Sequence, residues 1–151
     1  MTNLDDVDKN ILRILQDDCR TSYTAIAREL DVAESTVRYR VDKLKRDGVI
    51  TGYIALLNPR KIGLEITAIA LIKVDPKMVE DASKQLASFS ESHHLFKSTG
   101  EYDLVSVVHT RDIAHLNSLI DRIKQLPGVR EASAEVATYL IKVEPRFNMR
   151  Y

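Results

Sequence analysis

The sequence contains no tryptophan, only one cysteine and no long hydrophobic run. Cys19 cannot form a disulfide within the chain, which excludes a small disulfide-stapled scaffold and favours a reducing compartment such as the cytoplasm. The longest apolar stretch, residues 66–72, is too short to cross a bilayer, and the acidic first ten residues do not resemble a signal peptide. We therefore expect a globular cytoplasmic protein that has no membrane partner.

The chain also lacks an excess of charge of either sign, because 22 Lys and Arg residues balance 22 Asp and Glu residues. Net charge therefore does not indicate a nucleic-acid partner, and any DNA binding must come from a local cluster of basic residues. The four histidines do not form a complete metal-ligand pair, and Cys19 has no His or Asp array to activate it. We expect no metal, no cofactor and no catalytic residues.

Hydrophobic periodicity divides the sequence into a helical part and a mixed part. Apolar residues recur at helical spacing in three segments before Gly48, a glycine typical of the end of a helix. The segment 49–57 is rich in β-branched and aromatic residues, which predicts a strand, and residues 58–65 read as a linker. We assign residues 1–57 to a helix-turn-helix domain of the winged type with its following strand.

Residues 66–151 alternate between strand and helix patterns. The order is strand, helix, strand, strand, helix, and a long last strand from about Val129 to Val143, which is the βαββαβ arrangement of ferredoxin-like folds. The predicted fold class is therefore α+β, with a C-terminal ferredoxin-like sandwich for effector binding and oligomerisation. Apolar residues occupy both faces of the strand near residues 66–74, so we expect a second subunit to cover the face that the helices leave open.

The third helix is the most basic segment of the chain. Between Glu34 and Arg46, five basic residues outnumber two acidic residues, which gives a local charge of +3. Val37 and its apolar neighbours define one face of this helix, and serine, tyrosine and arginine side chains occupy the opposite face. Arginine can bind guanine through two hydrogen bonds, and hydroxyl groups can bind bases or phosphates, so the outer face is suited to a DNA major groove.

Three residues have the spacing of a helix-turn-helix unit. Ala27 is the small residue where the helices touch, Asp31 occupies the position that needs a left-handed backbone, and Val37 is the branched apolar residue six positions later. Glycine is usual at the middle position, but aspartate tolerates the left-handed region. The alternative interpretation of the third helix is an ordinary charged, solvated helix.

At this point the sequence resembles a known family. The stretch from Leu4 to Leu64 is similar to the N-terminal half of the leucine-responsive regulatory protein/AsnC family of prokaryotic transcription regulators. "STGEYDLV" and "LPGVREASAEV" resemble its C-terminal, effector-binding half. The family often has serine at the start of the recognition helix, where this chain has Ala33, so Asp31 or water must satisfy the free amides.

The resemblance implies a homodimer that assembles further, often to an octamer, and that binds a pseudo-palindromic double-stranded DNA operator. Each dimer would place two recognition helices in successive major grooves, and residues 49–57 would pair with their counterpart in the partner. The predicted DNA-binding residues fall into three groups. Base edges are assigned to Ser35, Arg38 and Tyr39, phosphates to Thr36, Arg40, Lys43 and Arg46, and further backbone contacts to Ser22 and Tyr23.

Members of this family are similar in binding a free amino acid, in a pocket between dimers lined by a loop that here comprises Thr99, Gly100, Glu101, Tyr102 and Asp103. Gly100 would let backbone N–H groups approach the carboxylate, and Asp103 would accept the ammonium group. Tyr102 would supply an apolar wall and a hydroxyl group. The alternative is a plain hairpin turn, which needs only the glycine.

The resemblance implies that residues of the last strand select the side chain of the bound amino acid. The candidate residues there are Ser133, Glu135, Val136, Ala137 and Thr138. If Glu135 points into the pocket, it favours lysine, arginine or glutamine and disfavours leucine, because an unpaired buried carboxylate is costly. The alternative is that Glu135 faces solvent.

Three questions stay open from the sequence alone. A siroheme-decarboxylase-like enzyme on the same fold is a competing function, although its chemistry would not require a basic recognition helix. A second competing function is that of an architectural DNA-binding protein that needs no effector. The basic and aromatic tail 145–151 is either frayed or packed on a neighbouring subunit.

Overall fold

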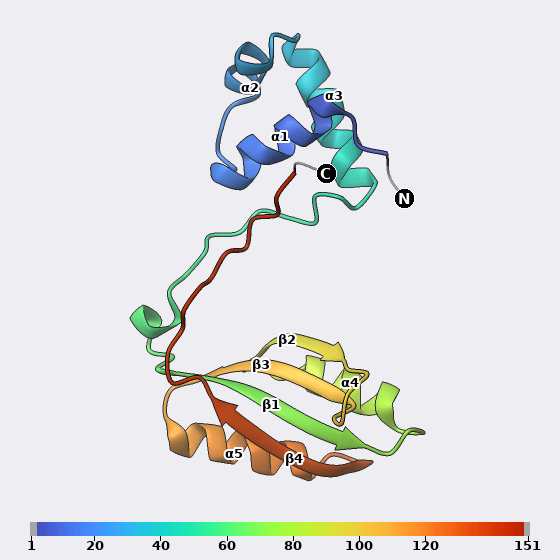
Figure 1. Ribbon diagram of the computed structural model, residues 1–151, viewed down its shortest axis with the longest axis vertical. Helices are drawn as coiled ribbons and strands as arrows, with labels where there is room; N and C mark the ends of the chain where they lie inside the picture. The colour runs from blue at the N-terminus through green and yellow to red at the C-terminus, as the bar shows by residue number, and fades with distance from the viewer. Residues whose placement is uncertain (1–2, 150–151) are drawn as a thin grey trace. The chain divides into compact units, whose positions relative to one another are not determined.

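The computed structural model describes residues 3–149, and they form two compact units. The helical unit contains the described residues up to Ala55 together with those from Lys142 onward, and the sheet unit is Leu56–Ile141. The α+β fold class predicted from the sequence is confirmed, with the helix-turn-helix preceding the four-stranded sheet (Figure 1).

The helical unit consists of α1 (Asp6–Asp17), α2 (Tyr23–Leu30) and α3 (Glu34–Arg46). A capping box starts α1, because the Asp5 side chain accepts from the Asp8 N–H at 2.9 Å and the Asp8 side chain accepts from the Asp5 N–H at 3.3 Å. Ile11, Ile26 and Val37 are completely buried where the three helices meet. The burial of one face of each helix fixes which side of α3 is turned outward.

The predicted helix-turn-helix spacing is confirmed at all three positions. Ala27 is buried, Asp31 has a left-handed backbone with φ 53° and ψ 48°, and Val37 lies in the core. The Asp31 conformation turns the chain between α2 and α3 without a glycine. Ala33 precedes α3 and provides no side-chain cap, as its substitution for serine predicts.

The segment 49–57 does not form the predicted strand. Ile54, Leu56 and Leu57 are strongly exposed, and no neighbouring strand within the described chain pairs with this segment. A strand needs a second backbone to satisfy its N–H and C=O groups, and a single chain does not supply one here. The predicted linker contains a short 3-10 helix, Pro59–Ile62, whose preceding residue Asn58 accepts from the Arg60 N–H at 3.1 Å.

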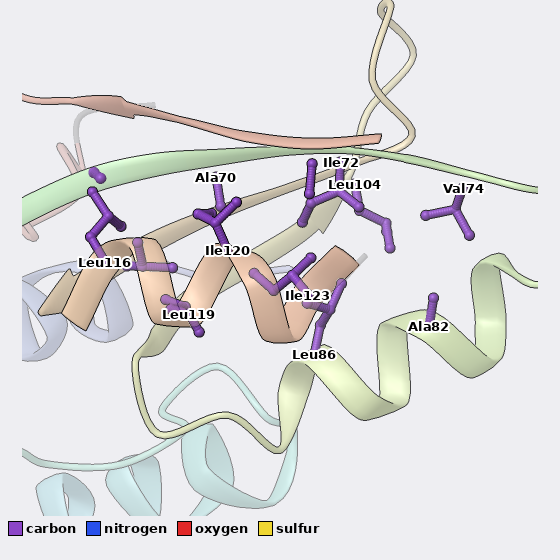
Figure 2. Close-up of a cluster of buried hydrophobic side chains, with 13 residues drawn as sticks. Ala70, Ile72, Val74, Ala82, Leu86, Leu104, Leu116, Leu119, Ile120 and Ile123 are labelled. Atoms are coloured by element: carbon purple, nitrogen blue, oxygen red, sulfur yellow. The ribbon is translucent and has the colours of Figure 1, made fainter. Parts of the chain in front are cut away.

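The sheet unit has the predicted βαββαβ order. Its elements are β1 (Ile66–Val74), α4 (Val79–Ala87), β2 (Ser92–Lys97), β3 (Leu104–Thr110), α5 (Ile113–Lys124) and β4 (Val129–Val136). All neighbouring strands are antiparallel in the order β2-β3-β1-β4. Both helices cover the same face, where Ala70 and Ile72 of β1 point toward Ile120 and Ile123 of α5 (Figure 2).

The opposite face of the sheet has no helix on it within the described residues (Figure 1). Alternation along the strands places Ile69, Leu71, Val105 and Val107 there, and the register pairs Ile69 with Val107 and Leu71 with Val105. Phe96 continues this apolar row on β2 and is 51% exposed. The expectation that this face is left uncovered by the helices of its own chain is therefore confirmed.

The predicted end of the last strand is wrong, and the described residues near the end of the chain contact the helical unit. β4 stops at Val136, not near Val143, because its partner β1 begins at Ile66 and the last cross-strand bond runs from the Ala137 N–H to the Thr67 carbonyl at 2.9 Å. The described residues from Lys142 onward form one compact unit with the three helices. Arg146 pairs with Asp17 of α1 at 2.9 Å. The Gln16 side chain exchanges two hydrogen bonds with the Phe147 backbone.

Candidate DNA-binding surface and effector site

The outer face of α3 carries the residues predicted to contact bases. Val37, Val41 and Leu44 face the core, so Ser35, Arg38 and Tyr39 are turned to the surface. Tyr39 is one of the large side chains that α3 leaves exposed, at 60%. Arg46 is exposed near the end of the same helix, and Thr36 and Lys43 are half-buried.

Arg38 is held by a network that the sequence analysis did not include. Its Nη2 donates to Glu34 Oε1 at 2.9 Å, and the Thr24 hydroxyl donates to Glu34 Oε2 at 2.7 Å. The Arg38 guanidinium also lies 5.3 Å from the centre of the Tyr23 ring. The Thr24 hydroxyl and, after it, Arg38 lower the pKa of Glu34. The four-residue spacing of Glu34 and Arg38 on one helix is a sequence signal that could have found this pair.

The two residues predicted to add backbone contacts, Ser22 and Tyr23, lie at the start of α2. Ser22 caps α2, because its Oγ accepts from the Ala25 N–H at 3.2 Å, and it remains exposed. Tyr23 is half-buried, with its ring turned toward Arg38. Both residues therefore lie beside the outer face of α3.

Arg40 does not lie on the outer face with the other basic residues. Its Nη1 is 2.6 Å from Asp5 Oδ2 and 3.3 Å from Asp8 Oδ2, and its side chain is only 27% exposed. The Asp8 N–H and then Arg40 hold the pKa of Asp5 below its usual value. Arg40 thus joins α3 to the start of α1, and the predicted phosphate contact does not fit this placement.

The loop between β2 and β3 is tied to the end of β1. The Ser98 N–H donates to the Asp103 carbonyl at 2.9 Å, and the Asp103 N–H donates to the Ile72 carbonyl at 3.0 Å. The Asp103 side chain accepts from the Val74 N–H at 2.7 Å through Oδ2. One carboxylate oxygen of Asp103 is thus used to hold the loop, and the other has no hydrogen-bond donor among the described residues.

Gly100 does not have the role that the sequence suggested. Its backbone is outside the left-handed region, and a Cβ atom there would meet only the Ser98 hydroxyl, at 3.4 Å. The Gly100 N–H donates to that hydroxyl at 3.1 Å. The turn therefore does not require glycine, and the argument that a hairpin needs Gly100 is wrong. Thr99 is exposed beside it.

Lys73 of β1 organises the remaining loop residues, and the sequence analysis missed it. Its Nζ is 2.9 Å from Glu101 and 3.3 Å from Glu131 of β4, and it lies 5.1 Å from the centre of the Tyr102 ring. Hydrogen bonds to Glu101 and then to Glu131 raise the pKa of Lys73. A single lysine inside the apolar run of β1 is the signal that could have pointed to it.

One chain does not bring the loop and the β4 candidates together. β3 and β4 lie on either side of β1, and Glu135 pairs with Ile69, four residues along β1 from Lys73. At about 3.3 Å per strand residue, that offset is roughly 13 Å. Ser133 and Glu135 lie on the open face, whereas Val136 pairs with Ala68 and lies on the helix-covered side. Ala137 and Thr138 follow the end of the strand.

Several features bear on other classes of function. Among residues 3–149, no group of three or more His, Cys, Asp or Glu side chains is placed to hold a metal ion. None of the helices in that range is long and apolar enough to cross a membrane. Cys19 is exposed.

The two units define a DNA-binding protein that carries a ligand-binding domain. A family model described as winged helix-turn-helix DNA-binding matches residues 4–51, and one described as the Lrp/AsnC ligand binding domain matches residues 67–147. The chain belongs to the Lrp/AsnC family, as its sequence resemblance indicated, and is a transcription regulator of that type.

Similar proteins come from archaea and bacteria. An HTH-type transcriptional regulator of Pyrococcus furiosus is 38% identical over 92% of this chain and 95% of its own length. The HTH-type transcriptional regulator Ptr1 of Methanocaldococcus jannaschii is 40% identical over 83% of this chain and 86% of its own. The solved structure of E. coli AsnC has a TM-score of 0.89 at 26% identity and covers 97% of this chain and 99% of its own.

Proposed function

We propose that this protein is a sequence-specific transcription regulator whose DNA binding or assembly is modulated by a small amino acid. The observation that carries the proposal is the outer face of α3, where Ser35, Arg38 and Tyr39 are exposed above a buried apolar face. These side chains supply the donors and hydroxyl groups that read base edges in a major groove. Thr36, Lys43 and Arg46 are the proposed phosphate contacts, together with Ser22 and Tyr23 at the start of α2.

The proposed DNA-binding form is a homodimer, assembling further to an octamer, on a pseudo-palindromic operator. Two features support self-association. The open face of the sheet exposes a contiguous apolar row, and the segment 49–57 keeps a strand-like composition without a strand partner. Two copies would bury the first feature and pair the second, and would present two α3 helices about one turn of DNA apart. The proposed location is the cytoplasm.

The proposed effector pocket combines the 99–103 loop of one copy with the β4 residues of another. The separation of Asp103 from Glu135 along β1 supports this arrangement, because neither chain alone brings them together. The free oxygen of Asp103 would accept the ammonium group of the amino acid. Glu135 faces apolar Ile69 and has no ion-pair partner among the described residues, so a cationic or amide side chain such as that of lysine, arginine or glutamine would neutralise or bind it.

DNA binding is tested by selecting operators from a random duplex library and measuring affinities by fluorescence anisotropy. We expect Arg38→Ala to weaken the preference for the selected sequence, while Arg111→Ala, an exposed arginine of the sheet unit, leaves it unchanged. Binding that does not distinguish sequences would favour an architectural protein instead.

The effector is tested by thermal shift with each of the twenty amino acids. Lysine, arginine or glutamine should raise the melting temperature, because a ligand that binds only the folded state stabilises it. The shift should be lost in Glu135→Leu. A response to leucine alone in the unmodified protein would contradict the role assigned to Glu135.

A further inference from the structure

The carboxylate of Glu34 is out of place on a DNA-reading helix. It lies in the first turn of α3 and is 43% exposed, beside the residues proposed to contact bases. A negative charge at this position repels the phosphate backbone and cancels one of the five positive charges of the helix. The helix N-terminus favours an acid electrostatically, but that does not explain the contacts that Glu34 makes.

Those contacts form a chain that ends at Arg38. The Thr24 hydroxyl fixes one carboxylate oxygen of Glu34, and the other accepts from Arg38 Nη2. The Tyr23 ring lies against the guanidinium from a different direction. Arg38 is thus held at its edge by α3 and at its face by α2, although its side chain is 60% exposed.

The held guanidinium keeps donors free for a ligand. An arginine has five N–H donors, and among the described residues only Nη2 of Arg38 makes a hydrogen bond. Nη2 keeps one hydrogen, which together with the neighbouring donor on Nη1 or Nε can still meet the O6 and N7 atoms of a guanine. An arginine that is already oriented loses less rotamer freedom when it binds.

We propose that Glu34, fixed by Thr24, is a positioning residue that together with the Tyr23 ring orients Arg38 toward a guanine and so determines specificity at one base pair of each half-site. This inference rests on the proposed function of α3 as the recognition helix. Glu34 itself does not touch the DNA. Its negative charge weakens binding to every sequence, and the orientation of Arg38 restores binding only where the guanine is present.

The test compares Glu34→Gln and Thr24→Val with Glu29→Gln, which removes one charge from an exposed ion pair of the same unit. Affinities are measured for the selected operator and for every single base-pair change in it. We expect Glu34→Gln to lower discrimination roughly tenfold at a single position per half-site, the position that Arg38→Ala also affects. Thr24→Val should lower discrimination there by a smaller factor, and Glu29→Gln should not change it.

Affinity for unrelated DNA should rise similarly in Glu34→Gln and Glu29→Gln, because both lose one negative charge. In the Arg38→Ala background, Glu34→Gln should have no further effect on discrimination. Unchanged discrimination in Glu34→Gln would overturn the proposal. A switch to a different preferred base would also overturn it, since Glu34 would then contact a base directly.

A measurement without DNA separates this proposal from the proposed function. The two side-chain Nη groups of Arg38 should give distinct ¹⁵N NMR signals in the free protein and a single averaged signal in Glu34→Gln. Free rotation of the guanidinium in the unmodified protein would contradict the positioning role. If the signals are distinct but Arg38→Ala weakens binding equally on all sequences, the failure lies in the assignment of α3 to base reading.

Discussion

The helical unit and the sheet unit differ in one respect. A single chain brings together the candidate residues of the first unit, but not those of the second. In the helical unit, α3 buries one face in its own core and presents a finished outer face, with Arg38 already held by residues of α2 and α3. In the sheet unit, one face is covered by α4 and α5, while the other is bare and the two groups of effector candidates are apart. On the function proposed above, one chain completes the outer face of α3, whereas the effector pocket needs residues from two chains.

The first prediction tests whether the two cores are independent. Ile26 and Ile72 are both completely buried, in clusters that share no residue. Ile26→Ala and Ile72→Ala should each cost about 2–5 kcal/mol through lost burial and an unfilled cavity. By calorimetry, each variant should lower only the unfolding transition of its own unit. A single transition lowered equally by both substitutions would break the distinction between the units.

The second prediction concerns the charged network around Glu91 in the sheet unit. Glu91 is 9% exposed and accepts from His115 Nε2 at 3.0 Å and from Arg122 Nη2. The Arg111 N–H donates to His115 Nδ1, so the proton of the neutral ring lies on Nε2, toward Glu91. Burial alone would raise the pKa of Glu91, but hydrogen bonds from His115, from its own backbone N–H and from Arg122 outweigh burial and lower that pKa to about 2.

A folded-state pKa below the unfolded value means that this stabilisation is complete above about pH 4.5 and is lost as the pH falls toward 2. The difference corresponds to a few kcal/mol. Glu91→Gln should therefore destabilise the sheet unit at pH 7 and flatten its acid dependence, as measured by urea unfolding between pH 7 and 2.5. The control is Glu65→Gln, an exposed acid of the same unit, which should follow the unmodified protein.

The elements of each unit could be predicted from the sequence because they depend on local patterns. The spacing of Ala27, Asp31 and Val37 and the alternation along β1 reflect burial within one chain, and the structure confirms both. The strand at 49–57 was predicted from composition, and its pairing was assigned to a partner chain; it is absent in the single chain, which supplies no second backbone. The extent of β4 likewise depended on where its partner strand begins.

The sequence indicates which types of residue form the candidate sites, but not which partners their side chains contact. The basic character of α3 singled out this helix, but it could not separate Arg38, which is exposed, from Arg40, which pairs with acids of α1 and its cap. Long side chains reach acids that are distant in sequence, such as Asp5, and only the fold shows which ones. Lys73 was missed for the same reason, because its acidic partners come from a loop and from β4.

The third prediction tests whether Arg40 stabilises the helical unit and does not contact DNA. Arg40→Ala leaves the buried carboxylate of Asp8 without its cation, so the melting temperature of the helical unit should fall by a few degrees. Because the pKa of Asp5 is lowered in the folded state, this contribution should be present above about pH 3.8 and fade as the pH falls further. The salt dependence of DNA binding should not change, because Arg40 is not expected to neutralise a phosphate.

Arg46→Ala is the matched variant, since Arg46 is an exposed arginine near the end of the same helix. It should leave the melting temperature unchanged and reduce the slope of log affinity against log salt concentration by about one. The two arginines would then show opposite responses, one in stability and one in salt dependence. If Arg40→Ala reduced the salt slope as much as Arg46→Ala without lowering stability, the Arg40 side chain would leave Asp5 and Asp8 for the DNA, and the helical unit would not be complete before binding.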